Sequence, residues 1–538
     1  MGRQWEERER RNNSQPEQNR ISKRMVFRRT VILMLICGVG FFIPLAVQLW
    51  NISIRDHNFY QQKAAEQQLM DVAVAAHRGD ILDANGEVMA MSATVYNLIL
   101  APKDLINSVD KDDFEDEDGK LDQSAYQAEI QRKRDEVADG LCAVRPDLDR
   151  ADLERRLEKE NSQYEVLLTN VEEGEAEAIR AFIEEHKTAY YLYLTPSTKR
   201  YYPFSALASQ VLGFVNTEGG VYGLEAGYED VLKGIPGRVV TGKTAKNVEM
   251  YNSYSNYIDA VNGYDLTLTL DSTIQAYAEQ AIETGIQAYD VRNGGFCVVM
   301  DPKTGAILAW ANSPTYDLNN PRSISDPALS AKLDAIKSDS SLSDEERSKQ
   351  RTELLYEQWS NKAINEPYEP GSTFKAMVLA AALEEGVVSE NDTFVCTGAA
   401  TVADRTIKCS DRDGHGDQNL AKAVANSCNP AFIAIGQRLG AEKFYDYVED
   451  FGFLSQTGID MMGEPNYSVF WSRDLFTSAN GITNLATASF GQRFKVTPIQ
   501  LLTAAASVIN GGHLMKPYVM ESITDANGNV LQHTEPTE

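Results

Sequence analysis

One serine and one lysine are spaced as an acyl-transfer site requires. The segment EPGSTFK (residues 369–375) precedes the helix-favouring run AMVLAAALEEG. This pattern predicts Ser372 at a helix N-terminus, with Lys375 one turn further on the same face. N–H groups at a helix start stabilise an oxyanion, and a partly buried, neutral lysine takes up a hydroxyl proton. Ser372 is therefore a candidate nucleophile and Lys375 its candidate base.

The Ser-x-x-Lys pair is weak evidence by itself. Serine favours helix N-caps in any case, and such a pair arises by chance about once or twice in a chain of this size. Ser108 with Lys111, in an acidic stretch, is a match of that kind. What distinguishes Ser372 is the later triplet Ser427-Cys428-Asn429, because Ser-x-x-Lys, Ser-x-Asn and Lys-Thr-Gly act together in serine acyl transfer. The alternative for Ser427 and Asn429 is a polar turn between helices.

The cysteine and histidine residues do not follow the spacing of a known metal-binding motif. The chain has six cysteines and six histidines, and they are scattered. We therefore predict neither a metal nor a cofactor. Cys37 lies in an apolar segment, and Cys396 with Cys409 is a possible disulfide.

The overall charge excludes one broad class of function. The 538 residues include 78 acidic and 51 basic side chains, a formal charge of -27. Such a chain repels phosphate backbones, so nucleic-acid binding is not expected. The length and the 43% apolar content predict several folded domains.

The segment Val31–Trp50 carries no charge. A helix of this length spans roughly 30 Å of hydrocarbon at ~1.5 Å per residue. We predict an uncleaved single-pass anchor over 30–50, with a buried core helix as the alternative. Several basic residues precede the span, so the N-terminus is expected in the cytoplasm and the bulk of the chain outside it.

The remaining chain divides by composition. Residues 1–29 are polar and charged, which predicts a disordered cytoplasmic tail. From 51 to 262 we expect an extracytoplasmic pedestal, β-rich near the Asn85-Gly86 turn and helical over about 102–187. A second domain over 263–538 opens with a strand at DLTLTLD and a helix capped by Asp271. Two strands then form a hairpin at 295–311, and an exposed insertion follows at 323–360.

Beyond these features, the chain resembles the class B penicillin-binding proteins, the monofunctional transpeptidases of peptidoglycan synthesis. The matching segments include 78–86, 200–203, 223–225, 368–375, 414–416, 427–429, 457–460 and 496–500. The resemblance implies an α/β (α+β) fold: a transmembrane helix, an elongated β-rich pedestal or dimerisation domain, and a penicillin-binding domain with an antiparallel sheet between helices. It implies an enzyme of elongation or sporulation type, inhibited by β-lactams.

The resemblance also assigns roles to residues. Ser372 attacks the carbonyl between two terminal D-alanines, Lys375 is the general base, and Ser427 relays a proton to the leaving amine. Asn429 hydrogen-bonds Lys375 and the substrate backbone. Gly371, Thr373 and Cys428 are expected to border the substrate. The implied partners are stem peptides and a SEDS-type glycosyltransferase of the same membrane.

The chain departs from the family pattern in one major respect. The third motif, Lys-Thr-Gly, is expected after Asn510-Gly511-Gly512 and does not occur before Glu538. The only such triplet, 303–305, is expected in a hairpin turn. We therefore expect the chain as given to be truncated before this motif and nearly inactive, with an open edge on the 295–311 hairpin and an unstable catalytic domain. Smaller departures are Ala84, Phe204-Ser205 and Arg493, the last where glycine is usual.

Two other functions remain open. Residues 237–244 satisfy the phosphate-loop pattern G-x-x-x-x-G-K-T, which would indicate an ATPase if a helix followed. A protein of the same fold could also be a β-lactam sensor or a catalytically silent scaffold.

Overall fold

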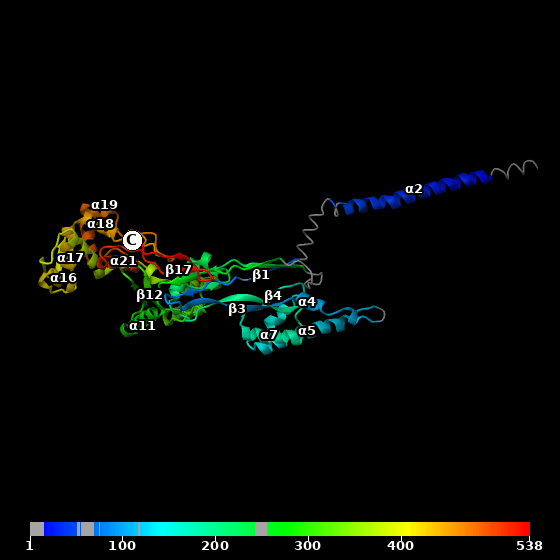
Figure 1. The fold of residues 1–538 in the computed structure, drawn as a ribbon, viewed down its shortest axis with the longest axis horizontal. Coiled ribbons are helices and arrows are strands. Elements are labelled where there is room, and N and C mark those ends of the chain that lie inside the picture. The colour runs from blue at the N-terminus through cyan, green and yellow to red at the C-terminus, as the bar shows by residue number, and fades with distance from the viewer. Residues whose placement is uncertain (1–14, 51–53, 55–68, 75, 117–118, 243–255) are drawn as a thin grey trace, which may run out of the picture. The chain divides into compact units, whose positions relative to one another are not determined.

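The computed structural model describes residues 15–50, 54, 69–74, 76–116, 119–242 and 256–538 (Figure 1). The chain forms two compact units. One comprises residues 1–74 with 237–259, and the other 75–236 with 260–538. All the candidate catalytic residues belong to the second unit.

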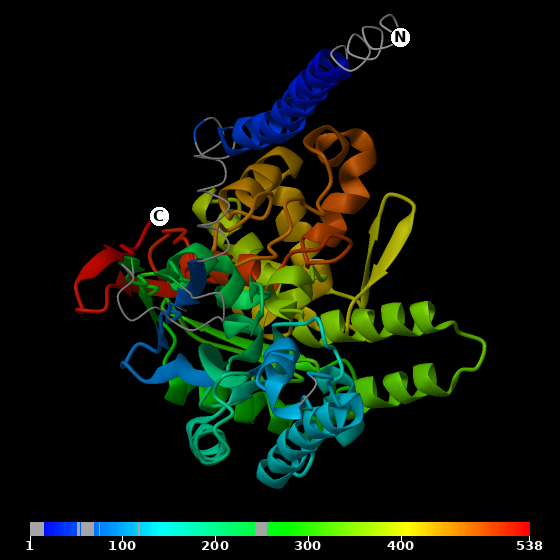
Figure 2. The ribbon, with the colours of Figure 1, turned by 90° about the vertical axis from the view of Figure 1, so that its right-hand side faces the viewer.

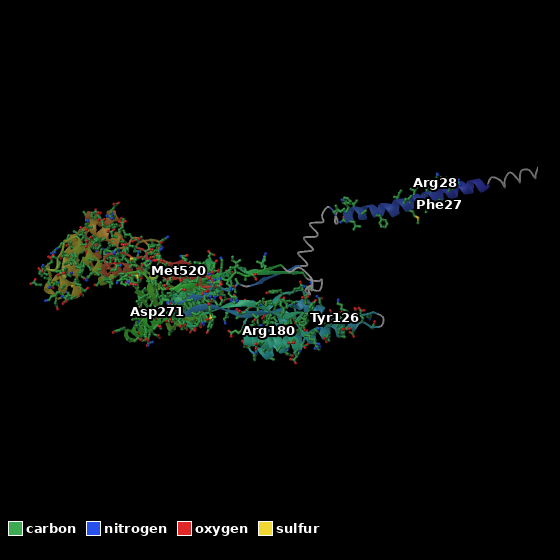
Figure 3. All side chains as sticks on the ribbon, in the orientation of Figure 1. Phe27, Arg28, Tyr126, Arg180, Asp271 and Met520 are labelled. Carbon is green, nitrogen blue, oxygen red and sulfur yellow. The ribbon has the colours of Figure 1, made fainter. Side chains whose placement is uncertain are left out.

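The first unit contains a long helix and a small sheet. Helix α2 (Gln15–Trp50) includes the predicted anchor, and Phe27 and Arg28 are exposed on it (Figure 3). Because it starts at Gln15, it extends into the segment predicted as a disordered tail. Residues 15–29 are rich in Gln, Glu, Lys and Arg, which lose little rotamer freedom in a helix. Over the described residues, no helix reaches the length and apolarity needed to cross a membrane.

The sheet of this unit bears on the phosphate-loop alternative. Strand β8 (Gly237–Gly242) lies between β1 (Leu69–Val74) and β9 (Asn256–Ile258), antiparallel to both. A phosphate loop would instead curl its backbone N–H groups around an anion ahead of a helix. Lys243 and Thr244 lie outside the described residues. The strand at 237–242 argues against the ATPase interpretation.

A seven-stranded sheet runs through the second unit. Its order is β18-β17-β10-β2-β3-β4, with β5 also paired to β3. The strands are β2 (Ile81–Leu82), β3 (Val88–Leu100), β4 (Glu165–Val171), β5 (Leu192–Tyr201), β10 (Asp265–Leu268), β17 (Met520–Thr524) and β18 (Val530–His533). Strand β10 is parallel to β2 and antiparallel to β17. The sheet thus joins strands from both sides of residue 262, where a domain boundary was expected. That boundary stays a prediction.

The predicted strand and helix at the start of the catalytic domain are confirmed. Leu266 and Leu268 alternate with polar residues along β10 and are fully buried. The side chain of Asp271, labelled in Figure 3, accepts the N–H groups of Thr273 and Ile274 at the start of α11 (Ser272–Tyr289). The turn before β3 supports the same cap, because Asn85 Nδ2 donates to Asp271 Oδ2 at 2.9 Å.

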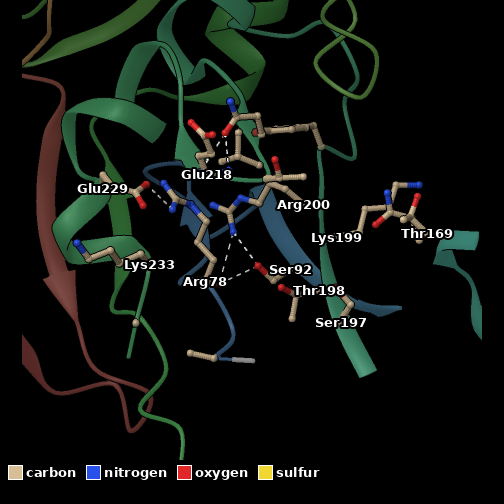
Figure 4. A pocket seen from close by; sticks show the side chains of 18 of the residues that line it. Arg78, Ser92, Thr169, Ser197, Thr198, Lys199, Arg200, Glu218, Glu229 and Lys233 are labelled. Carbon is tan, nitrogen blue, oxygen red and sulfur yellow. Dashed lines mark hydrogen bonds and ion pairs between the residues drawn. The ribbon is translucent and has the colours of Figure 1, made fainter. Parts of the chain in front are cut away.

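Three segments of the pedestal meet in a buried ion network beside an open groove (Figure 4). Glu225, in α9 (Gly223–Gly227), is fully buried and lies 2.6 Å from both Arg78 Nε and Arg200 Nε. Arg78 also pairs at 2.6 Å with Glu229, the first residue of α10 (Glu229–Leu232). Buried charges require such pairing. The motifs at 78–86, 200–203 and 223–225 therefore hold the pedestal together.

The acidic part of the pedestal, predicted to be helical over about 102–187, is mostly helical, but strand β4 (Glu165–Val171) interrupts it. Its elements are α4 (Pro102–Asn107), η2 (Asp112–Phe114), α5 (Gln123–Val144), α6 (Arg150–Leu157) and α7 (Glu173–Glu185). The inner faces of α5 and α7 bury Ile130, Val137 and Ile179 against β3, β4 and β5, while charged residues face solvent. Arg180 stacks on Tyr96, 4.5 Å from the ring centre. Smaller elements are α8 (Ser209–Leu212), β6 (Val215–Asn216) and β7 (Gly219–Gly220).

The predicted hairpin is formed by β11 (Gly295–Met300) and β12 (Ile307–Ser313), and α11 packs on it. Lys303, Thr304 and Gly305 form its turn, where Gly305 N donates to Asp301 O at 2.9 Å. The Lys-Thr-Gly triplet is therefore a turn, as predicted. Among the described strands, β11 pairs only with β12. The instability expected from this edge stays a prediction.

The candidate nucleophile belongs to a helical region packed around buried aromatic side chains. Its helices are η3 (Gly371–Phe374), α15 (Lys375–Glu384), α16 (Leu420–Ala425), α17 (Asn429–Leu439), α18 (Ala441–Asp450), α19 (Arg473–Thr477), η4 (Ala479–Gly481), α20 (Ile482–Ala488) and α21 (Pro498–Ile509). Two hairpin-like pairs join them: β13 (Thr393–Cys396) with β16 (Gly416–Asn419), and β14 (Ala399–Val402) with β15 (Arg405–Lys408). The insertion forms α12 (Pro327–Ser338) and α13 (Asp344–Trp359), which project side by side, followed by α14 (Lys362–Asn365) (Figure 2).

Candidate active site

Ser372 lies in the 3-10 turn η3, which runs directly into α15. Ser372 is exposed, whereas Phe374 is buried and packs on Phe494 and Phe453 with ring centres 4.9 and 5.2 Å away. The first N–H groups of a helix have no intrahelical acceptor. The aromatic core therefore anchors the turn, while the Ser372 hydroxyl stays exposed and the N–H groups that follow Gly371 can bind an oxyanion.

Lys375 connects the two predicted motifs. Its Nζ lies 2.7 Å from Ser427 O and 2.8 Å from Asn429 Oδ1, both of which can only accept hydrogen bonds. It also lies 3.2 Å from Ser372 Oγ and 2.9 Å from Ser427 Oγ. A neutral amine donates two N–H bonds and keeps one lone pair. The two obligate acceptors take both bonds, so the lone pair faces the two serine hydroxyls.

The surroundings of Lys375 favour that neutral form. The residue is 4% exposed, and its Nζ lies 5.3 Å from the centre of the Phe432 ring. Burial lowers the pKa of Lys375 to about 8, despite a smaller raising effect from Cys409 and Cys428 nearby. Roughly a tenth of the Lys375 amine is then unprotonated at pH 7, far more than for an ordinary lysine, and this neutral fraction can act as a general base.

This pKa predicts the pH dependence of acylation. The second-order rate constant for reaction with benzylpenicillin should rise about tenfold per pH unit and level off above a pH near 8, because only the neutral amine accepts the Ser372 proton. Stopped-flow or intact-mass kinetics measure it, with circular dichroism to check that the fold persists. A rate independent of pH below the pKa would contradict this role.

Ser427 and Asn429 are held by a turn rather than by a continuous helix. Ser427 lies between α16 and α17 with φ at +47°, and its Oγ is 2.9 Å from Ser372 Oγ. Asn429 opens α17, and its Nδ2 donates to Lys408 O at 3.3 Å. This second bond fixes the amide so that its oxygen faces Lys375. The structure brings together all four residues predicted as catalytic.

A glycine that the sequence analysis did not select shapes the nucleophile turn. Gly491 O accepts the N–H of Gly371 at 2.8 Å, and both glycines have positive φ, +79° and +58°. A Cβ on Gly491 would lie 1.9 Å from Gly371 O. Only glycine allows this approach without moving the backbone beside Ser372. The available signal in the sequence was that Gly491 lies two positions before Arg493, where the family usually has glycine.

The unusual Arg493 occupies a strained position. Its φ is +71°, a region that a residue with a Cβ adopts at a cost. We expect Arg493→Gly to stabilise the fold by about 1 kcal/mol at most, since the freedom of glycine in the unfolded chain offsets part of the gain. The midpoint of thermal unfolding measures this, and Arg493→Ala is the control because it keeps the Cβ. An equal gain in both variants would contradict the backbone explanation.

The predicted substrate-binding residues have different surroundings. Thr373 is exposed, and its hydroxyl donates to Pro370 O at 2.5 Å. Gly371 is partly exposed beside the nucleophile, so both remain predictions. Cys428 differs: it is fully buried, with its thiol directed toward Cys396 and Cys409. Its thiol is therefore not available to a substrate, and only its backbone could border one, so this role also stays a prediction. Among the described cysteines none forms a disulfide.

Two protein-family models match most of the second unit. The model for the "Penicillin-binding Protein dimerisation domain" matches residues 73–268. The model for the "Penicillin binding protein transpeptidase domain" matches residues 295–538. The pedestal and the region containing Ser372 thus correspond to two family domains in this order.

Curated relatives align along nearly the whole chain. Stage V sporulation protein D of Bacillus subtilis is 29% identical over 500 residues, which cover 93% of this chain and 67% of that protein. Penicillin-binding protein PbpB of Mycolicibacterium smegmatis is 25% identical, covering 97% and 74%. Peptidoglycan D,D-transpeptidase MrdA of Escherichia coli is 24% identical, covering 94% and 75%.

Solved structures share the fold. A peptidoglycan synthetase from Bifidobacterium adolescentis superposes with a TM-score of 0.58 at 25% identity, covering 87% of this chain and 79% of that one. A complex of penicillin-binding protein PBP2 with MreC from Helicobacter pylori gives a TM-score of 0.62 at 22% identity, covering 85% and 80%. The mixed α/β architecture is therefore common to this chain and these proteins.

Proposed function

The chain belongs to the class B penicillin-binding proteins, and on that premise we propose that it is a peptidoglycan D,D-transpeptidase acting through an acyl-enzyme on Ser372. The observation that carries this proposal is the position of Lys375 Nζ, within 3.2 Å of Ser372 Oγ and 2.8 Å of Asn429 Oδ1. It gives one buried amine access to the nucleophile and to both residues of the second motif.

Acylation follows from these contacts. Ser372 Oγ transfers its proton to Lys375 Nζ and bonds to the carbonyl carbon between the two terminal D-alanines. N–H groups at the helix start stabilise the oxyanion. The carbon–nitrogen bond then breaks, and the departing D-alanine amine receives a proton through Ser427, whose Oγ lies 2.9 Å from Lys375 Nζ. The product is an ester on Ser372.

Deacylation reverses these proton movements. The amine of a second stem peptide attacks the ester carbon and gives its proton to Lys375, and Ser372 Oγ regains a proton as the ester bond breaks. The new amide is the cross-link. A β-lactam acylates Ser372 in the same way, but its amine remains tethered, so the adduct is released slowly.

The decisive test supplies a donor and an acceptor together. A thioester analogue of an acyl-D-alanine is incubated with the protein and a D-amino acid, and mass spectrometry follows the acyl-enzyme and the new amide. We expect both species, formed slowly because no Lys-Thr-Gly motif follows Asn429 in this sequence. A stable adduct that no amine releases would indicate the β-lactam sensor, and the absence of any adduct on Ser372 would indicate the silent scaffold.

We also propose that the protein is anchored in the bacterial cell membrane by one segment over 30–50, with the N-terminus cytoplasmic. The uncharged sequence from Val31 to Trp50 and the basic residues before it support this. Membrane fractionation, with and without residues 1–50, tests it. Recovery of the intact chain in the soluble fraction would contradict the anchor.

A membrane partner completes the proposal. By analogy with the family, the anchor and pedestal bind a SEDS-type glycosyltransferase, so that strand polymerisation and cross-linking are coupled. The solved complex of a structural neighbour with MreC supports the more general idea that such proteins work in assemblies. Failure to co-purify with the glycosyltransferase in mild detergent would count against this partner.

A further inference from the structure

Three cysteines and a histidine converge directly behind the candidate active site. The thiols of Cys396, Cys409 and Cys428 and a ring nitrogen of His415 all lie within 4.8 Å of one another. The three cysteines are buried and the histidine is partly buried. None of these side chains has a role in the proposed reaction.

The four residues come from separate short segments that are folded to meet. Cys396 ends β13 and Cys409 follows β15, while His415 precedes β16 and Cys428 caps α17. Strand pairing sets Cys396 opposite Gly416, which places His415 beside it. Cys409 N donates to Gly398 O at 2.9 Å, which closes the loop between the first two ligands.

Glycines make this crowding possible. Gly398 and Gly414 have φ values of +87° and +86°. A Cβ on Gly414 would lie 2.3 Å from Cys396 O, and one on Gly398 would lie 2.0 Å from Arg412 O. The backbone is therefore wrapped tightly around the thiols, as in a ligand-binding knuckle.

One ligand separation matches a tetrahedral cation, and the other ligand atoms lie within 4.8 Å of one another. A zinc ion bound at ~2.3 Å by sulfur and ~2.0–2.1 Å by nitrogen separates two sulfurs by about 3.8 Å, and a sulfur and a nitrogen by about 3.6 Å. Cys409 Sγ and His415 Nδ1 are 3.7 Å apart. Three thiolates and one imidazole form a soft, closed ligand set, which is typical of structural zinc.

We propose that Cys396, Cys409, His415 and Cys428 bind one structural Zn²⁺ ion. This assignment replaces the expectation, drawn from sequence spacing, that the chain binds no metal. Metal binding itself does not depend on the proposed reaction, so the two proposals can fail separately.

The ion would hold the second catalytic motif in place. Cys428 stands between Ser427 and Asn429, the two residues that contact Lys375 Nζ. The N–H of Asn429 is directed at the Cys409 thiol, and its side chain donates to the carbonyl of Lys408, the residue before Cys409. Two of the four ligands, Cys428 and Cys409, thus belong to or contact the Ser427–Asn429 turn. Bound zinc would therefore help to position the catalytic groups of this turn.

Metal analysis tests the site directly. The untagged chain is purified without added metal, and zinc is measured by inductively coupled plasma mass spectrometry. We expect about one zinc per chain, lost in Cys396→Ser and Cys409→Ser and retained in Cys142→Ser and Cys297→Ser, whose thiols lie elsewhere. A metal-free protein that takes up no zinc, a Cys396–Cys409 disulfide, bound iron, or equal zinc in all four variants would overturn the proposal.

Two further measurements keep the test independent of folding defects. Cobalt substituted into the wild-type protein should give the intense visible bands of a tetrahedral thiolate site. His415→Cys should retain the metal, whereas His415→Ala should lose it or bind it at least tenfold more weakly. Six-coordinate cobalt bands, or equal affinity in both histidine variants, would contradict the assigned ligands.

The positioning role has its own readout. Zinc removed by a chelator should slow acylation by benzylpenicillin, and restored zinc should recover it, while the far-ultraviolet circular dichroism of the whole chain stays constant. An acylation rate that does not change with zinc content would overturn the positioning role and leave the metal site itself intact.

Discussion

Ser372→Ala is expected to abolish acylation by benzylpenicillin, with the rate of adduct formation falling by at least about 10³-fold. The hydroxyl is the only group that forms the ester, and neither Ser427 nor Thr373 replaces it. Ser427 Oγ is bound by Lys375 Nζ at 2.9 Å, and the Thr373 hydroxyl is directed to Pro370 O. Intact-mass spectrometry followed by peptide mapping measures the adduct.

The chain provides a matched control for this variant. Ser108 belongs to a second Ser-x-x-Lys sequence, and its Oγ donates to Leu105 O at 2.6 Å and accepts from Lys133 at 2.9 Å. Ser108→Ala should therefore be acylated at the wild-type rate. Acylation that survives in Ser372→Ala, or that maps to another residue in the wild type, would refute the proposed nucleophile.

Lys375→Met is expected to slow acylation by about 10²- to 10⁴-fold, because the hydroxyl proton loses its acceptor. The remaining rate should no longer rise through the pKa near 8 of the wild-type lysine. Methionine has a similar length and suits the contact with Phe432. It leaves Ser427 O and Asn429 Oδ1 without a donor, so a loss of roughly 1–3 kcal/mol of stability per unpaired group is also expected.

The control for this variant is Lys303→Met in the hairpin turn, which carries the chain's only Lys-Thr-Gly sequence. It should keep both the rate and its pH dependence. The stability loss is measured separately by thermal unfolding, so a slow rate in a folded Lys375→Met protein reports on proton transfer. A folded variant with the wild-type pH profile would exclude Lys375 as the base.

Local sequence patterns predicted much of the fold. The alternation at 265–268 gave β10, Asp271 gave the cap of α11, and the turn residues at 301–305 gave the hairpin. Each depends on contacts between residues close in sequence, which periodicity and capping rules describe. The Ser372–Lys375 spacing belongs to the same category, since one helical turn determines it.

Features that are assembled from distant segments could not be predicted from local sequence patterns. The cysteines and the histidine follow no spacing typical of zinc, and they meet only because two strand pairs and a helix start converge. Gly491 approaches Gly371 across the fold, and its requirement for glycine comes from a steric contact rather than a local pattern. Residues 15–29 show a different error. Their polar composition predicted disorder, but they belong to helix α2, because many of these residues have good helix propensity.

The central strand β10 also determines when its sheet can form during synthesis. Leu266 of β10 pairs with Ile81 of β2 on one side and with Ile523 of β17 on the other. A ribosome adding about 5–20 residues per second needs tens of seconds between the first and the last of these strands. Until then one edge of β10 has no partner from β17 and is open to pairing with a strand of another chain.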